Sequence, residues 1–316
     1  MKQIIVIVGP TGVGKTKLSI ELAKYYNGEI INADAMQIYQ DLNIGTAKIT
    51  EAEKENIPHH LFDIKNVTEE YSIYQYQIDC RKKIREIRKK KKTPILVGGT
   101  GLYIKSALYD YKLNPIQEKK EQFEKVSTEE LFQKLISIDK KAINNIDKNN
   151  RRRIINALNF YNQNQFSITE NKTDTLLYDC LFIGLTTERT HLYQLINQRT
   201  DKMMENGLLE EVKQFYDKNI YAKPLTSGIG YKELYDYLNE KTSLEEAIEN
   251  IKKNSRRYAK RQYTFFNHQL PVMWFETNYN DFNQTVKNVC KYIDNINKLW
   301  YNNQKKWKQQ LSRIKK

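Results

Sequence analysis

With 316 residues, of which 40% are hydrophobic, the chain is long enough to bury a large core, which excludes disorder throughout. No apolar run approaches the roughly 20 residues that a membrane-spanning helix needs, and the first one ends in a glycine-rich turn rather than a signal-peptide cleavage site, so we expect a cytoplasmic protein. The formal net charge of +14 indicates either a lysine-rich genome or a polyanionic partner.

The predicted elements alternate between strands and helices over the first part of the chain. Apolar runs typical of strands lie at 4–8, 29–32, 95–97 and 181–185. Between them apolar residues recur at helical spacing, most clearly over 73–87, and this pattern ends shortly before a Thr-Pro pair. Strands that alternate with helices pair in parallel, so we predict an α/β fold with a parallel sheet.

A helical insertion is predicted in the middle of the chain. The alternation of strands and helices stops after Leu102, and a long segment without a strand signal precedes the fourth strand. This segment contains a capping box, S-T-E-E at 127–130, and a helical run at 151–161. We therefore predict a helical insertion at 113–175.

The remaining segments form the predicted core and a basic tail. We assign 1–112 and 176–280 to the core, whose last part is helical apart from one possible strand at 272–275. The segment 281–316 is predicted to be a basic tail. From Thr285 onward it carries nine lysines and arginines against one aspartate, so we expect it to add affinity for a polyanion such as RNA.

The first strand runs into a glycine-rich turn, G-P-T-G-V-G-K-T at 9–16, which fits the pattern G-x-x-x-x-G-K-[ST]. In this pattern the backbone amides and the following helix N-terminus bind phosphate, the lysine adds positive charge and the hydroxyl holds Mg²⁺. We therefore predict a P-loop NTPase-like sheet with a phosphate site after its first strand. Its predicted residues are Gly9, Pro10, Thr11, Gly12, Val13, Gly14, Lys15 and Thr16, with Thr16 as the metal ligand.

Polar residues also follow the other three strands. Ligands of open parallel sheets bind beyond the carboxyl ends of the strands, so we expect these residues near the phosphate site. Asp34 follows the second strand and fits three roles: a metal ligand through water, a general base or a helix cap. Thr100, in G-G-T-G after the third strand, offers a hydroxyl, and Arg189 follows the fourth strand. No histidine or cysteine nucleophile is among them.

A basic helix is predicted over 251–262, where cations recur every four residues in two rows. Such a helix is either an ordinary solvated face or a surface for a polyanion, and the scarcity of acids between its cations favours RNA. Three consecutive arginines in the predicted insertion add to this interpretation. The cations are Lys252, Arg256 and Lys260 in one row, Lys253, Arg257 and Arg261 in the other, and Arg151, Arg152 and Arg153 in the insertion.

Taken in order, these motifs resemble those of the tRNA dimethylallyltransferases, the isopentenyltransferases that modify adenosine 37 beside the anticodon. The resemblance extends from the glycine-rich turn to about Phe275, and the ordered set is far more specific than the turn alone. The further motifs are D-A-M-Q-I-Y at 34–39, G-T-A-K at 45–48, P-H-H-L-F-D at 58–63, G-G-T-G-L-Y at 98–103, R-R-R-I-I-N-A-L at 151–158, G-L-T-T-E-R at 184–189, G-L-L-E-E-V at 207–212, G-I-G-Y-K-E at 228–233 and R-Y-A-K-R-Q at 257–262.

The resemblance implies an activity and roles for these residues. It implies transfer of a dimethylallyl group from dimethylallyl diphosphate to N6 of adenosine 37, in tRNAs that read codons beginning with U. The phosphate loop then holds diphosphate with Mg²⁺, where the loop alone would suggest ATP. Asp34 is implied as the general base, Thr100 and Lys15 as the other catalytic residues, and the tRNA anticodon arm as the partner of a monomeric enzyme. The residues expected to contact tRNA are Asp34, Ala35, Met36, Gln37, Thr100, Arg151, Arg152, Arg153, Arg256 and Arg257.

The sequence departs from the family pattern at two positions that bear on the site. Ala35 stands where the family usually has serine, and Ser227 stands where some relatives place an arginine that binds diphosphate. We therefore expect diphosphate binding to depend on Lys15 and on Arg189 or Arg256.

Two tyrosines and three cysteines complete the expectations. Tyr39 and Tyr103 are either core residues or stacking partners for a flipped-out base. Cys80, Cys180 and Cys290 have no paired spacing, which argues against a zinc cluster or a disulfide framework and fits a reducing compartment and a bacterial form without a zinc finger.

Two other functions remain open from the motifs alone. A P-loop kinase for a small metabolite would need a lid with several arginines, and no compact lid is evident. A nucleic-acid-binding NTPase would need coupling motifs in addition to a carboxylate after the second strand, and only Asp34 is present. Both rank below the transferase.

Overall fold

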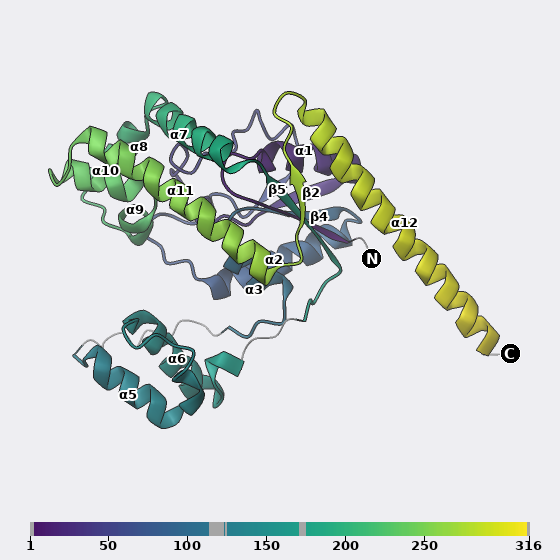
Figure 1. Cartoon of the computed structure of the whole chain (residues 1–316), viewed down its shortest axis with the longest axis horizontal. Coiled ribbons are helices and arrows are strands. Elements are labelled where there is room, and N and C mark those ends of the chain that lie inside the picture. The colour runs from purple at the N-terminus through teal and green to yellow at the C-terminus, as the bar shows by residue number, and fades with distance from the viewer. Residues whose placement is uncertain (1–2, 114–122, 124, 171–174, 315–316) are drawn as a thin grey trace. The chain divides into compact units, whose positions relative to one another are not determined.

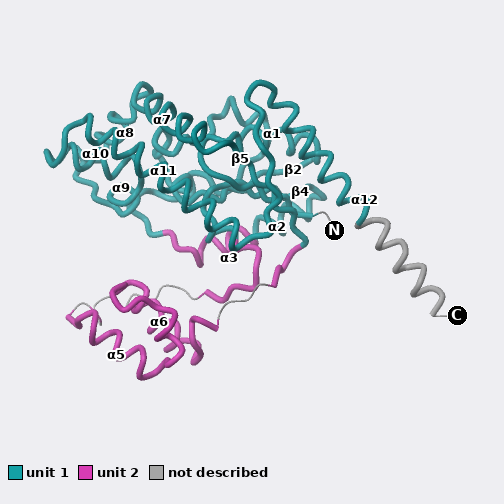
Figure 2. Tube along the Cα trace, viewed as in Figure 1, with its two compact units in different colours: residues 1–70, 82–104, 179–316 teal, residues 71–81, 105–178 magenta. Residues whose placement is uncertain are grey.

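The computed structural model describes residues 3–113, 123, 125–170 and 175–314, with side chains described up to Leu299. The chain divides into two compact units (Figure 2). Unit 1 comprises Met1–Glu70, Lys82–Ile104 and Asp179–Lys316, and unit 2 comprises Tyr71–Arg81 and Lys105–Tyr178. Within the described residues, every helix is too short or too polar to span a membrane.

Unit 1 is built on a parallel sheet, in which Figure 1 labels β2, β4 and β5. Within the described residues the sheet has six strands in the order β3-β2-β4-β1-β5-β6. The predicted α/β fold is confirmed, as are the four expected strands and the possible strand at 272–275. β3 was not expected, because two residues are too few to give a strand pattern. The strands are β1 (Ile4–Val8), β2 (Gly28–Asn32), β3 (His59–His60), β4 (Thr93–Val97), β5 (Cys180–Thr186) and β6 (Met273–Glu276).

β1 lies inside the sheet, between β4 and β5. Ile5 pairs with Ile95 on one side, and Val6 pairs with Phe182 on the other. All five residues of β1 are buried, as expected for a parallel strand covered on both faces. The turn that follows β1 therefore lies at the middle of the sheet's C-terminal edge.

Helices from both ends of unit 1 share its hydrophobic core. Leu18 and Leu22 of α1 (Lys15–Tyr26) belong to the same buried cluster as Val289 and Ile293 of α12 (Phe282–Ile314). The expected tail at 281–316 thus begins as a helix that packs on the core, and its side chains beyond Leu299 lie outside the described residues. The other helices of unit 1 are α7 (Arg189–Glu205), α8 (Leu208–Tyr216), α9 (Lys223–Ser227), α10 (Tyr231–Leu238) and α11 (Leu244–Gln269).

Unit 2 contains the helices of the expected insertion at 113–175. α5 (Thr128–Ile138) begins at the predicted capping box, where the Ser127 hydroxyl accepts from the Glu130 amide and the Glu130 carboxylate accepts from the Ser127 amide. This capping box is confirmed. α6 (Arg151–Asn164) packs against α5 through a small core formed by Leu131, Leu135, Ile154 and Leu158.

Two helices belong partly to each unit. α2 (Ile73–Lys89) confirms the helix expected over 73–87, and α3 (Gly101–Leu108) follows the turn after β4. Unit 2 consequently includes more of the chain than the expected insertion, because it takes in the first turns of α2 and the second half of α3.

Arg151 has a structural use inside unit 2. Its guanidinium donates to the carbonyl oxygens of Val126 at 2.7 Å and Phe123 at 2.5 Å, which ties α6 to the segment before α5. Arg152 and Arg153 are exposed. Of the three consecutive arginines in this unit, Arg151 therefore holds the fold together, while Arg152 and Arg153 are accessible.

Candidate active site

A cavity of about 380 Å³ lies at the C-terminal edge of the sheet in unit 1. Its wall includes Lys15 and Thr16 from the turn after β1, Asp34 from the segment after β2 and Thr100 from the turn after β4. The structure thus brings together the polar residues expected at three strand ends. The other predicted site residues in the wall are Thr11, Ala35, Met36 and Gln37.

The turn after β1 curls around the lysine that it carries. Lys15 Nζ donates to the carbonyl oxygen of Pro10 at 2.6 Å, and α1 begins at Lys15, so the first amides of this helix lie at the turn. On the other side of the turn, the Thr277 hydroxyl donates to the carbonyl oxygen of Val13 at 2.9 Å. A residue from the C-terminal part of the chain thus supports the predicted phosphate loop.

Lys15 and Arg199 place two partly buried positive charges near this turn. Burial, and then the charge of Arg199, lower the pKa of Lys15 to about 8, against a smaller raising effect of Asp34. Burial also lowers the pKa of Arg199. Burial disfavours the charged form of both side chains, and an anion such as diphosphate would stabilise both charges.

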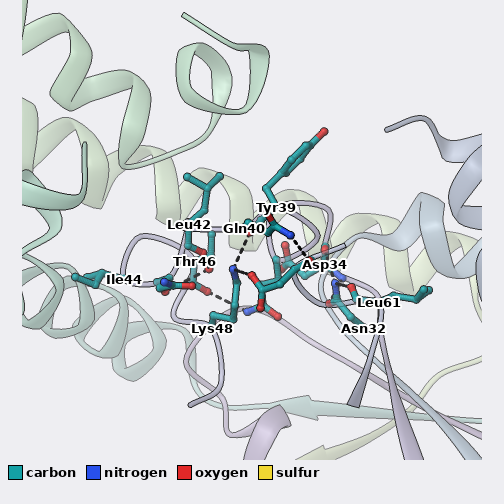
Figure 3. Close-up of polar contacts among 12 residues, drawn as sticks. Asn32, Asp34, Tyr39, Gln40, Leu42, Ile44, Thr46, Lys48 and Leu61 are labelled. Carbon is teal, nitrogen blue, oxygen red and sulfur yellow. Dashed lines mark hydrogen bonds and ion pairs between the residues drawn. The ribbon is translucent and has the colours of Figure 1, made fainter. Parts of the chain in front are cut away.

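Asp34 sits in a tight turn directly after β2 (Figure 3). Its Oδ1 accepts from the Met36 amide at 3.0 Å, and its own amide donates to the Asn32 side-chain oxygen at 2.8 Å. Asn32 is buried and also donates to the carbonyl oxygen of Leu61 at 3.0 Å. Asp34 therefore caps a turn rather than a helix, and one carboxylate oxygen is held while Oδ2 makes no hydrogen bond to a described residue.

The turn after β4 lies directly against the turn of Asp34. The Thr100 amide donates to the carbonyl oxygen of Ala33 at 3.0 Å, and the Thr100 hydroxyl accepts from the Ala35 amide at 3.0 Å. A Cβ atom at Gly98 would lie 2.2 Å from the carbonyl group of Ala33, so only glycine permits this approach. The two strand ends consequently hold Asp34 and Thr100 as neighbours in the cavity wall.

Arg199 is the cavity cation that the sequence prediction missed. It lies on α7 and donates to the carbonyl oxygen of Thr46 at 3.4 Å. The residues of α7 that line the cavity share one helical face, a signal at spacings of three and four that was available in the sequence. They are Ile196, Arg199, Thr200 and Met203.

Neither cation expected to assist Lys15 lies in the cavity wall. Arg189 is exposed at the first turn of α7, where its Nε donates to the Tyr193 hydroxyl at 3.1 Å. Arg256 donates to the side-chain oxygen of Asn197 at 2.6 Å. Arg199, in contrast, lines the cavity, so it is better placed than either of them to face a ligand there.

The two basic rows of α11 have different surroundings. Lys252 in the first row forms ion pairs with Asp201 of α7 at 2.7 Å and with Glu249 at 3.2 Å, so acidic residues outside the row neutralise part of its charge. Lys253, Arg257 and Arg261 of the second row are exposed. The second row, together with the exposed Lys260 of the first, is therefore the part of this helix that is open to a polyanion.

Tyr258 lines the cavity, whereas the two tyrosines considered as stacking partners do not. Tyr39 and Tyr103 are 9% and 8% exposed, which makes them core residues. Tyr258 lines the cavity, and burial raises its pKa to about 12. The Arg261 guanidinium lies 5.6 Å from the centre of the Tyr258 ring, so a flat cationic and aromatic surface borders the cavity.

Three comparisons relate this chain to known proteins. A model of the IPP transferase family matches residues 37–269. The tRNA dimethylallyltransferase of Anoxybacillus flavithermus is 46% identical over 93% of this chain and 96% of its own length. The crystal structure of the full-length tRNA isopentenylpyrophosphate transferase of Bacillus halodurans superposes with a TM-score of 0.73 at 41% identity, over 93% of this chain and 96% of that one.

A eukaryotic structure is also similar. A eukaryotic dimethylallyltransferase acting on tRNA matches with a TM-score of 0.78 at 32% identity, and the match covers 87% of this chain and 74% of that protein. The bacterial relatives match over nearly the whole of both chains, and the family model covers most of this one. This chain belongs to the IPP transferase family.

Proposed function

We propose that the protein transfers the dimethylallyl group of dimethylallyl diphosphate to N6 of adenosine 37 in tRNAs that read codons beginning with U. The observation that carries this proposal is the shared cavity of Lys15, Asp34 and Thr100. A loop for a phosphate leaving group and a carboxylate for a proton face the same space. The names of the relatives, which include tRNA dimethylallyltransferases, support the same activity.

The diphosphate site is assigned to the turn after β1 together with Arg199. Lys15, the amides at the start of α1 and the Arg199 guanidinium supply positive charge on one side of the cavity. As the bond between the allylic carbon and the diphosphate oxygen breaks, negative charge accumulates on the departing diphosphate. Fixed donors stabilise that charge more in the transition state than in the substrate.

Asp34 is assigned as the general base. The lone pair of adenine N6 is delocalised into the ring, so this nitrogen attacks only weakly unless it loses a proton. Asp34 Oδ2 accepts the N6 proton while N6 forms a bond to the allylic carbon and the diphosphate leaves with its electron pair. A positioned base of this kind contributes typically about 10² to 10⁴ in rate.

Mg²⁺ fits the residues present at this site. Within the described residues, no group of three or more histidines, cysteines, aspartates or glutamates is placed to hold a metal ion. Mg²⁺ is usually bound by one or two protein oxygens together with substrate phosphates and water. Thr16 offers such an oxygen in the cavity wall, and Mg²⁺ bound there would neutralise charge on the diphosphate.

The tRNA contacts are assigned to both units. In unit 1 we assign Gln37 and Tyr258 in the cavity wall and the exposed second row of α11. In unit 2 we assign the exposed Arg152 and Arg153. The target nucleotide must leave its stack to reach the cavity, at a cost of about a few kcal/mol that phosphate contacts and stacking on Tyr258 would offset.

One assay tests the proposed function against its rivals. The full-length protein is incubated with unmodified tRNA, Mg²⁺ and dimethylallyl diphosphate, and in parallel with ATP, and the tRNA is digested to nucleosides for mass spectrometry. We expect adenosine with one added C₅H₈ unit in the first reaction only. Phosphate release from ATP with no change in the tRNA would instead support a kinase or an NTPase.

A further inference from the structure

The loop between β2 and β3 is held by a buried carboxylate that no part of the proposed mechanism uses. Glu211, on α8, accepts from three consecutive amides of this loop: Asn43 at 3.0 Å, Ile44 at 2.7 Å and Gly45 at 3.1 Å. It also accepts from the Tyr231 hydroxyl at 2.6 Å. Glu211 is 7% exposed, and within the described residues it forms no ion pair, so amides and a phenol alone satisfy its charge.

The loop that Glu211 holds also packs closely against α10. A Cβ atom at Gly45 would lie 2.7 Å from the ring and the hydroxyl oxygen of Tyr231, so the loop touches the ring directly. Tyr231 is fully buried, and Glu211 raises its pKa further after the effect of burial. A buried anion held by four donors fixes the loop far more firmly than surface contacts would.

The residue that follows these amides bonds with two side chains of the candidate site. The carbonyl oxygen of Thr46 accepts from Gln37 Nε2 at 3.1 Å and from Arg199 at 3.4 Å. Gln37 is assigned to tRNA and Arg199 to diphosphate, and both line the cavity together with Thr46. One chain of hydrogen bonds thus runs from Glu211 through the loop to both substrate-binding side chains.

We infer that Glu211 is a positioning residue for the transfer reaction, acting through the 43–46 loop on Gln37 and Arg199. This inference rests on the proposed function. Its physical basis is that the orientation of a long side chain depends on the carbonyl group to which it donates, and the position of this carbonyl depends on Glu211. Displacement of catalytic groups by about 1 Å can cost a hundredfold in rate.

The test compares Glu211→Gln with Glu210→Gln and Tyr231→Phe in the full-length protein. The amide introduced by Glu211→Gln would present N–H groups to the loop amides, Glu210 is exposed on the same helix, and Tyr231→Phe removes one of four donors. We expect Glu211→Gln to lower kcat/KM about tenfold to a hundredfold, Tyr231→Phe to lower it less, and Glu210→Gln to match the wild type.

Two further measurements separate positioning from general stability. Hydrogen exchange of the Asn43, Ile44 and Gly45 amides should be slow in the wild type and fast in Glu211→Gln. In a Gln37→Ala background, Glu211→Gln should lose part of its effect on kcat, because both changes break the same chain of hydrogen bonds.

Three outcomes would overturn the inference. They are fast hydrogen exchange of these amides in the wild type, a kcat/KM of Glu211→Gln within twofold of the wild type, or effects of Glu211→Gln and Gln37→Ala on kcat that are fully additive. If Glu211→Gln does not fold, the inference is decided by kcat/KM of Tyr231→Phe and by hydrogen exchange of the three loop amides in the wild type. Wild-type protein without prenyl transfer would instead refute the proposed function.

Discussion

The hydroxyl oxygen of Thr100 accepts a hydrogen bond from the backbone amide of Ala35 at 3.0 Å. This bond joins the turn after β4 to the residue next to the assigned base. Serine is usual in the family where this chain has Ala35, but the contact to Thr100 uses the backbone, so alanine keeps it. The position of Asp34 therefore does not depend on a hydroxyl at residue 35.

Replacing Thr100 tests the importance of this bond. Thr100→Val keeps the shape of the side chain but removes the acceptor, so the turn of Asp34 loses one of its restraints. We expect kcat to fall about tenfold or more, with Thr100→Ser close to the wild type. Steady-state kinetics with tRNA in excess would measure this, and equal rates for the two variants would contradict it.

Replacing Asp34 tests the assigned base. Asp34→Asn keeps the hydrogen bond that Oδ1 accepts from the Met36 amide but cannot take a proton from N6. We expect prenyl transfer to fall by about 10² or more, while the dissociation constant for tRNA changes little. Filter binding and single-turnover transfer measure the two quantities. Turnover near the wild-type rate would show that Asp34 is not the base.

The lowered pKa of Lys15 predicts how substrate binding varies with pH. A bound diphosphate favours the protonated amine, whose pKa in the free protein is about 8. Affinity should therefore be constant between pH 7 and 8 and fall about tenfold per pH unit above pH 8. Calorimetry with dimethylallyl diphosphate in the absence of tRNA measures this, since its phosphates, with a pKa of about 6, are already ionised above pH 7. Constant affinity between pH 7 and 9.5 would contradict the prediction.

Arg199 should control both the affinity and its pH dependence. Arg199→Gln removes a cation from the cavity, so binding at pH 7 should weaken about tenfold or more. The pKa of Lys15 should rise in this variant, because the charge of Arg199 is one cause of its lowering. The fall in affinity would then begin at a higher pH. Arg189→Gln is the control, and a larger effect of that variant would reverse the assignment.

Glu29 predicts a loss of stability in acid. Its buried carboxylate contacts Lys92 at 2.9 Å, His60 at 2.7 Å and Lys90 at 3.2 Å. Burial raises its pKa, but these three partners together outweigh burial and hold the pKa at about 2. This value lies below the ordinary 4.5, so the stabilisation is complete above pH 4.5 and is lost as the pH falls toward 2.

Glu29→Gln should therefore lower the free energy of unfolding by about 1 to 3 kcal/mol at pH 7. The difference from the wild type should shrink below pH 4.5. Urea unfolding across pH 3 to 7 measures it, with Glu51→Gln, on an exposed ion pair, as the control. A difference that does not vary with pH would show that packing, not charge, is responsible.

The sequence was most informative where the backbone determines the chemistry. The apolar run of β1 and the glycine-rich turn predicted a buried strand followed by a turn at the edge of the sheet, and the rule for strand ends placed Asp34 and Thr100 near that turn. Such features depend on neighbours in the chain. They can therefore be recognised without knowing how distant segments pack.

Side chains whose roles depend on distant packing were harder to predict. Arg199 and Arg189 lie on the same helix, and only the packing of α7 decides which of them faces the cavity. Arg151 looked like an RNA contact, but carbonyl groups at Phe123 and Val126 accept its hydrogen bonds. One of the acidic residues that form ion pairs with Lys252 lies on another helix. Periodicity gives the face of a helix but not what covers it.

The place of β1 between β4 and β5 has a consequence for how the protein is made on the ribosome. Its first strand is synthesised early, yet both neighbours follow much later, and the hydroxyl that supports the phosphate loop belongs to Thr277. An emerging chain must keep its most apolar strand unpaired until β4 and β5 have been translated. Binding of diphosphate should therefore appear only once the segment that carries Thr277 has left the exit tunnel.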